Sequence, residues 1–130
     1  MVGVLLAIGV AALGKFTRFE EDRSFYSTVL IIIASYYVLF AVMGGSGHAL
    51  VWELIVAAAF STVAILGAFH APSLVGVGIV AHGFFDLAHD AFIENSGVPT
   101  WYPSFCGSID IFLGVWVIIL VRSRRTCSMR

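Results

Sequence analysis

The sequence predicts an all-α integral membrane protein: a polytopic helical bundle with four long transmembrane helices and a short apolar helix at the N-terminus. Of its 130 residues, 60% are hydrophobic and only 12% are charged, and its mean hydropathy is +1.00. Soluble domains carry about 25% charged residues, so this chain lacks the polar groups to cover a surface in water. Its apolar residues also lie in long runs separated by short polar breaks, as expected of membrane-spanning helices.

The composition excludes several other classes of protein. A formal net charge of −1 provides no basic excess for binding nucleic acid. The chain is too apolar to be disordered, and 2 Cys cannot form a disulfide framework. Since no internal repeat or long linker divides the sequence, we expect residues 1–130 to form one membrane domain.

Five apolar segments account for the predicted helices. A membrane crossing needs about 20 mainly apolar residues, with a range of about 17–25. Four segments satisfy this: residues 24–43, 48–70, 72–93 and 105–121. The glycine-rich turn at 44–47 ends the first of them, Pro72 suits a helix start, and the Gly- and Pro-containing stretch 94–104 is typical of a loop. The remaining segment, residues 1–17, is short, because its apolar part reaches only about 21 Å against a hydrocarbon core of about 30 Å.

All Lys and Arg residues fall on one side of the predicted bundle. They precede the first long span or follow the last, and the two loops on the opposite side contain none. The cations are Lys15, Arg18, Arg23, Arg122, Arg124, Arg125 and Arg130. Because cytoplasmic loops are enriched in Lys and Arg, we predict a multi-pass protein of the plasma or inner membrane, in contact with the lipid bilayer, with a cytoplasmic C-terminus.

Five acidic residues lie in the outer half of the predicted bundle, without a cation near them in the sequence. Glu53, Asp86 and Asp110 lie inside three different spans at similar depths. An ionised carboxylate at membrane depth costs at least about 2.5–3.5 kcal/mol, so each must be protonated, bound to a cation or open to water. The other two, Asp90 and Glu94, are expected in water at a helix end.

The segment that contains Asp86 adds two histidines to this set. His82 and Asp86 are separated by four positions and Asp86 and His89 by three, so all three lie on one helix face. The two histidines are about 10.5 Å apart along the axis, so one ion would take Asp86 and one histidine, with Glu53 and Asp110 completing its shell. We therefore predict a metal site with these five residues as candidate ligands. Imidazole and carboxylate together suit Zn, Fe, Mn or Cu(II).

Three functions are compatible with this pattern. The metal site would serve metal handling or metal-dependent chemistry on a lipophilic substrate, and no sequence motif decides whether the protein is an enzyme. Alternatively, the same carboxylates form a proton-coupled or cation pathway, which in so small a bundle requires a homo-oligomer. In the third interpretation the polar face serves only packing, in an accessory subunit of a larger membrane complex. His48 and His70, at the ends of spans, are expected to be solvated.

Overall fold

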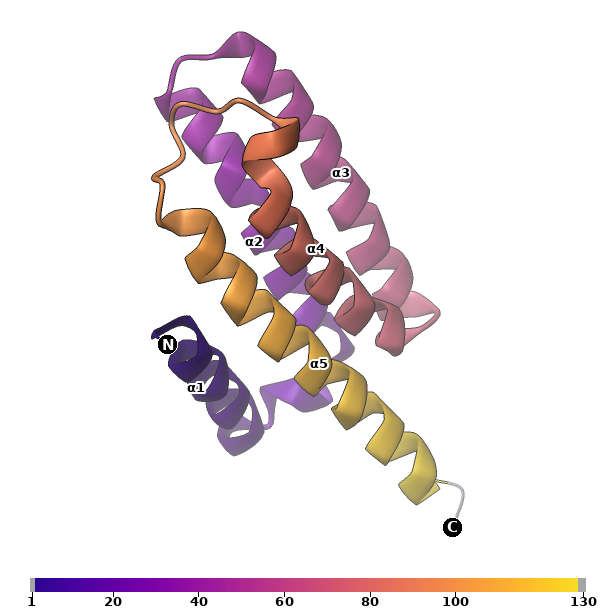
Figure 1. Cartoon of the computed structure of the whole chain (residues 1–130). Coiled ribbons are helices and arrows are strands. Elements are labelled where there is room, and N and C mark those ends of the chain that lie inside the picture. The colour runs from indigo at the N-terminus through magenta and orange to yellow at the C-terminus, as the bar shows by residue number, and fades with distance from the viewer. Residues whose placement is uncertain (1, 129–130) are drawn as a thin grey trace.

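The computed structural model describes residues 2–128, and these residues form helices without any strand (Figure 1). The side chains of residues 20, 23, 125, 126 and 128 are not described. The first helix, α1, spans Val2–Thr17, and a short 3-10 turn, η1 (Phe19–Glu21), connects it to the main bundle. That bundle consists of α2 (Arg23–Met43), α3 (Gly47–Phe69), α4 (Pro72–Phe92) and α5 (Tyr102–Ser128).

Helices α2 to α5 run alternately in opposite directions, and α4 packs against the other three. The turn at residues 44–46 and the loop at 93–101 lie at one end of the bundle, which we call the loop end (Figure 1). The α3–α4 turn and the C-terminal part of α5 lie at the opposite end, the basic end. Helix α1 packs along α5 in the same direction, with Gly3 beside Ser108 and Ala11 in the apolar cluster that includes Trp116.

Within residues 2–128, three helices are long and apolar enough to cross a membrane: Ser24–Met43, Gly47–Phe69 and Tyr102–Arg124. As expected, α1 is apolar but shorter. The prediction of a fourth long span, at residues 72–93, is not confirmed. At 21 residues α4 is as long as α2, but its polar side chains lower its hydropathy. They are His82, Asp86, His89 and Asp90.

The central position of α4 explains its polar composition. Its buried face carries apolar side chains toward the basic end, among them Val75 and Ile79. Toward the loop end the same face carries His82, Asp86 and His89. Because α2, α3 and α5 pack around this helix, these polar side chains face protein groups, and the bundle has an apolar core in one half and a polar core in the other.

Paired glycines allow α4 and α5 to approach closely. A Cβ atom added to Gly83 would lie 2.9 Å from the carbonyl oxygen of Gly107, and one on Gly107 would lie 2.9 Å from the carbonyl oxygen of Gly83. Further along, Gly76 and Gly114 approach one another in the same way, at 3.0 and 2.7 Å. Small residues let helix backbones pack closely in membrane proteins. This contact places Asp110, which lies between the two glycines of α5, against α4.

Helix α5 is longer than its predicted apolar segment, 105–121, at both ends. It begins at Tyr102, and Pro103 lies in its first turn, where a proline has no intrahelical hydrogen bond to lose. It continues to Ser128 through an arginine-containing stretch, because arginine is a good helix former despite its polarity. Hydropathy therefore locates the apolar part of this helix but not its ends.

Asp22 caps the N-terminus of α2. Its Oδ1 atom accepts hydrogen bonds from the backbone N–H of Ser24 at 2.8 Å and from the Ser24 hydroxyl at 2.7 Å. These two hydrogen bonds, the backbone one foremost, lower the pKa of Asp22 below its ordinary value of 3.8. A carboxylate with a lowered pKa stabilises the fold above its unfolded-state pKa, and this contribution is lost as the pH falls through the folded-state pKa.

We therefore expect Asp22→Ala to lower the thermal unfolding midpoint at neutral pH, because the cap is lost. The difference from the wild type should shrink as the pH falls below 3.8, the ordinary pKa of the group. Circular dichroism of both proteins in detergent, measured over a series of pH values, checks this. A difference that stays constant down to the acid limit would contradict the role of the ionised cap.

Candidate metal site

Three buried side chains from two helices meet in the polar half of the core. They are His82 and Asp86 of α4 and Asp110 of α5, and we call them the triad. Their exposed fractions are 1%, 0% and 1%. His82 Nδ1 lies 2.8 Å from Asp110 Oδ2 and 3.6 Å from Asp86 Oδ2. One potential ligand atom from each residue lies within 4.8 Å of the other two, so the triad can hold one metal ion.

Aromatic rings surround the triad. Phe60 of α3 meets the His82 ring edge to face, with centroids 4.9 Å apart, and Tyr37 of α2 lies 6.2 Å from it. The Tyr37 hydroxyl lies near Asp86 without forming a hydrogen bond of good geometry. Aromatic side chains packed around a site exclude water and strengthen the electrostatic interactions inside it.

Several buried atoms of the triad have no hydrogen-bond partner among the described residues. They are both carboxylate oxygens of Asp86 and the Nε2 atom of His82. In folded proteins the large majority of buried polar side-chain atoms are hydrogen-bonded, so each exception needs a specific explanation. Carboxylate oxygens are ligands of divalent transition metals, and a cation bound beside Asp86 would satisfy its carboxylate.

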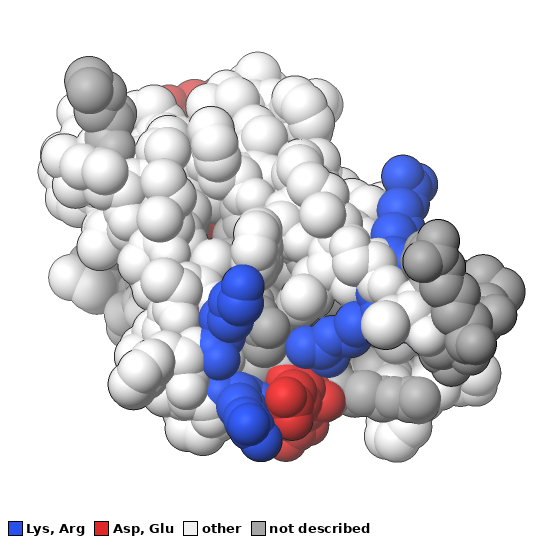
Figure 2. Space-filling model, turned by 90° about the horizontal axis from the view of Figure 1, so that it is seen from below, with Lys and Arg blue, Asp and Glu red and all other residues white. Residues whose placement is uncertain are grey.

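The charge of the triad also fits a divalent cation. Within the described structure, the ion-pair contacts of Asp86 and Asp110 are with His82. The described Lys and Arg side chains lie at the basic end, away from this half of the core (Figure 2). Two ionised carboxylates beside a neutral imidazole carry two negative charges, which one divalent ion neutralises.

Glu53, His89 and Asn95 form a second buried group, which we call the His89 group. His89 Nε2 lies 2.7 Å from Glu53 Oε1. The side-chain amide of Asn95, in the loop after α4, donates to the same Glu53 oxygen at 2.9 Å and to the main-chain carbonyl of Tyr37 at 3.2 Å. Through these hydrogen bonds, the His89 group connects α2, α3, α4 and the long loop near the loop end.

The structure divides the five predicted ligands between these two groups. Asp110 joins His82 and Asp86 in the triad, so the structure brings Asp86 together with one histidine and with a carboxylate from another helix. Glu53 does not join that cluster; it contacts His89. The two histidines are about 10.5 Å apart along α4, so each contacts a different neighbouring helix. His82 meets Asp110 of α5, and His89 meets Glu53 of α3.

Two residues that the sequence did not assign connect or complete these groups. The Tyr37 ring stacks on the His89 ring, with centroids 4.1 Å apart and an interplanar angle of 16°, while its other contacts reach the triad. In the sequence, only the position of Tyr37 within an apolar span indicated that its hydroxyl needs a partner. Asn95 lies in a polar loop, where asparagine is ordinary, so nothing in the sequence distinguished it.

The other histidines and outer acids considered in the sequence lie at or near the surface of the bundle. His48 accepts a hydrogen bond from Trp52 at 3.3 Å near the surface, and His70 is exposed where α3 ends. Glu94 is exposed in the loop after α4. Asp90 is 81% exposed, yet its Oδ1 atom lies 3.3 Å from His89 Nδ1, so it touches the His89 group from the outside.

Neither the curated proteins nor the solved structures include a match to this chain. Residues 1–123 match a family of unknown function, DUF6010. The matching region contains the triad, the His89 group and most of the five helices. The chain therefore belongs to the DUF6010 family.

Proposed function

We propose that this protein is an integral membrane protein that binds a divalent transition-metal ion at the triad. The observation that carries the proposal is the group of three buried ligand atoms within 4.8 Å of one another. Two ligand atoms that each lie about 2.0–2.2 Å from one ion are at most about 4.4 Å apart. The triad therefore needs only small side-chain adjustments to bind the ion, and no change in helix packing.

The ligand types narrow the choice of metal and its use. One imidazole and two carboxylates favour Zn, Fe, Mn or Cu(II) over Cu(I), which prefers sulfur ligands. Three protein ligands leave a coordination position open, as in catalytic zinc sites. An open position suits either the handling of the ion or metal-dependent chemistry on a lipophilic substrate that reaches the site from the bilayer.

The proposal includes a membrane arrangement in which α4 also crosses the bilayer, enclosed by its neighbours. Large apolar side chains are exposed on α2, α3 and α5 and on the outer face of α4 itself, which supports contact with lipid. Examples are Ile32, Leu54, Ile65, Phe84 and Ile119. With the polar face of α4 covered by protein, the bundle presents an apolar outer surface even though α4 alone does not have the composition of a span.

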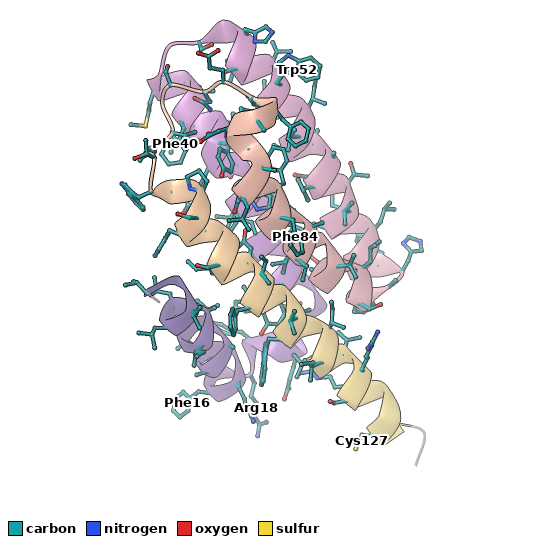
Figure 3. All side chains as sticks on the ribbon, viewed as in Figure 1. Phe16, Arg18, Phe40, Trp52, Phe84 and Cys127 are labelled. Atoms are coloured by element: carbon teal, nitrogen blue, oxygen red, sulfur yellow. The ribbon has the colours of Figure 1, made fainter. Side chains whose placement is uncertain are left out.

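The distribution of charged side chains supports the orientation in which the C-terminus faces the cytoplasm. Figure 2 shows Lys and Arg side chains gathered at the basic end, and Figure 3 places Arg18 there and Trp52 toward the loop end. The side chains of Arg23 and Arg125 and residue Arg130 lie outside the described residues. Positively charged segments favour the cytoplasmic side, so the basic end faces the cytoplasm. The triad then lies in the outer half of the membrane.

Metal analysis of the protein purified in mild detergent tests this function. After incubation with Zn, Mn, Fe(II) or Cu(II) and removal of free ion, we expect about one equivalent of bound metal for at least one of them. Mass spectrometry of the metal content gives the stoichiometry. Less than about a tenth of an equivalent of every metal would contradict the proposal.

A further inference from the structure

His89 joins a buried carboxyl group to an exposed one. Its Nε2 atom lies 2.7 Å from Glu53 Oε1, and the side chains of both residues are 0% exposed. Its Nδ1 atom lies 3.3 Å from Oδ1 of Asp90, whose side chain is 81% exposed. A histidine that served only to pair with the buried Glu53 would need only the first contact. The His89 ring instead has one nitrogen beside the buried acid and the other beside an acid in water.

We propose that Asp90, His89 and Glu53 form a proton path through which the buried Glu53 carboxyl exchanges its proton with water at the loop end. Asp90 takes a proton from a hydronium ion, which leaves as water, and gives the proton to Nδ1 of a His89 ring that carries its own proton on Nε2. That Nε2 proton passes to the Glu53 carboxylate. The ring ends neutral with its proton on Nδ1, Glu53 is neutral, and Asp90 is again an anion, so protons and charge balance. The reverse steps unload Glu53.

The packing around His89 suits this transfer. The Tyr37 ring stacks on it at 4.1 Å, and Phe85 meets it edge on at 5.6 Å. These contacts hold the imidazole plane so that both nitrogens stay directed at their carboxylates. Loading and unloading need no rotation of the ring, because the reverse transfer restores the first tautomer.

The side chains that face His89 are either acidic or neutral. Glu53 comes from α3, Asp90 from α4 itself and Tyr37 from α2, and Tyr102 of α5 lies behind Tyr37 at 5.7 Å. Asn95 donates to Glu53 Oε1 and has no proton to exchange with a carboxylate. The path therefore has one buried end, Glu53, and one end in water, Asp90, and it does not depend on a metal ion at the triad.

Hydrogen–deuterium exchange of the Glu53 carboxyl group, followed by infrared spectroscopy in D2O, tests the path. The Glu53 band is identified by its loss in Glu53→Gln. Asp90→Asn should slow the exchange about tenfold or more, because proton transfer through a positioned side chain is lost. Glu94→Gln is the matched control, since it removes an exposed acid four residues further along that is not part of the path, and should leave the rate unchanged.

Further measurements separate proton transfer from a change in structure. Asp90→Glu, which restores a carboxylate, should recover the fast exchange, and the backbone amides of α4 should exchange equally in all variants. Equal carboxyl exchange in Asp90→Asn and Glu94→Gln would overturn the proposal. It would also be overturned if no Glu53 carboxyl band were present at any pH at which the protein is folded, or if Asp90→Glu exchanged as slowly as Asp90→Asn.

Discussion

Asp110→Asn is expected to weaken metal binding by about a hundredfold or more while leaving the helical fold intact. Substitutions in the outer shell of metal sites already cost about 10- to 100-fold in affinity, and this one removes a charged ligand itself. Asparagine nearly preserves the volume of the side chain and can still hydrogen-bond His82. Competition with a chelator of known affinity, in detergent, gives the change in the dissociation constant.

Glu53→Gln is the matched control for this experiment. It also removes one buried carboxylate at similar depth, but from the His89 group, which does not contribute to the triad. We expect its metal affinity to stay within about threefold of the wild type, well below the loss caused by removing a ligand. If both variants lost affinity equally, the shell predicted from the sequence, in which Glu53 and Asp110 bind the same ion with Asp86 and one histidine, would be correct and the triad would not be the complete protein ligand set. If Asp110→Asn bound as well as the wild type, the triad would not be the site.

Gly83→Ala is expected to destabilise the protein by about 1–3 kcal/mol, the usual cost of overpacking a close contact. The added Cβ would lie 2.9 Å from the carbonyl oxygen of Gly107 and 3.0 Å from Cβ of Asp110, and a backbone oxygen cannot move aside without shifting α5. Because α5 carries Asp110, the same variant should also weaken metal binding. Unfolding by a denaturing detergent, followed by circular dichroism, measures the change in stability.

Gly9→Ala provides the control for this substitution. A Cβ added to Gly9 of α1 meets nothing within 4 Å, so the exchange should be neutral or stabilise the helix by about 0.5–1 kcal/mol, the intrinsic preference for alanine. Equal stability of Gly83→Ala and the wild type would show that α4 and α5 are not held together by this close contact. Destabilisation by both variants would show instead that the effect is not specific to the helix crossing.

The properties that depend on local sequence were predictable. Hydropathy is a sum over neighbouring residues, so it identified the apolar helices that the structure contains. The common face of His82, Asp86 and His89 follows from helical periodicity alone, and the structure buries all three side chains. The position of each described cation at one end of the bundle follows from its place in the chain once the helices alternate in direction.

The partners of these residues depended on how the helices cross. Asp110 meets His82 because the close glycine contact between α4 and α5 sets the depth of these two helices relative to one another. Glu53 meets His89 because of the way α3 packs against α4. A shift of one neighbouring helix by a single turn, about 5.4 Å, would separate these partners without changing the periodicity of any single helix. The composition of α4 likewise could not show that this helix lies inside the bundle, since its polar residues are compatible with burial only when three neighbours cover them.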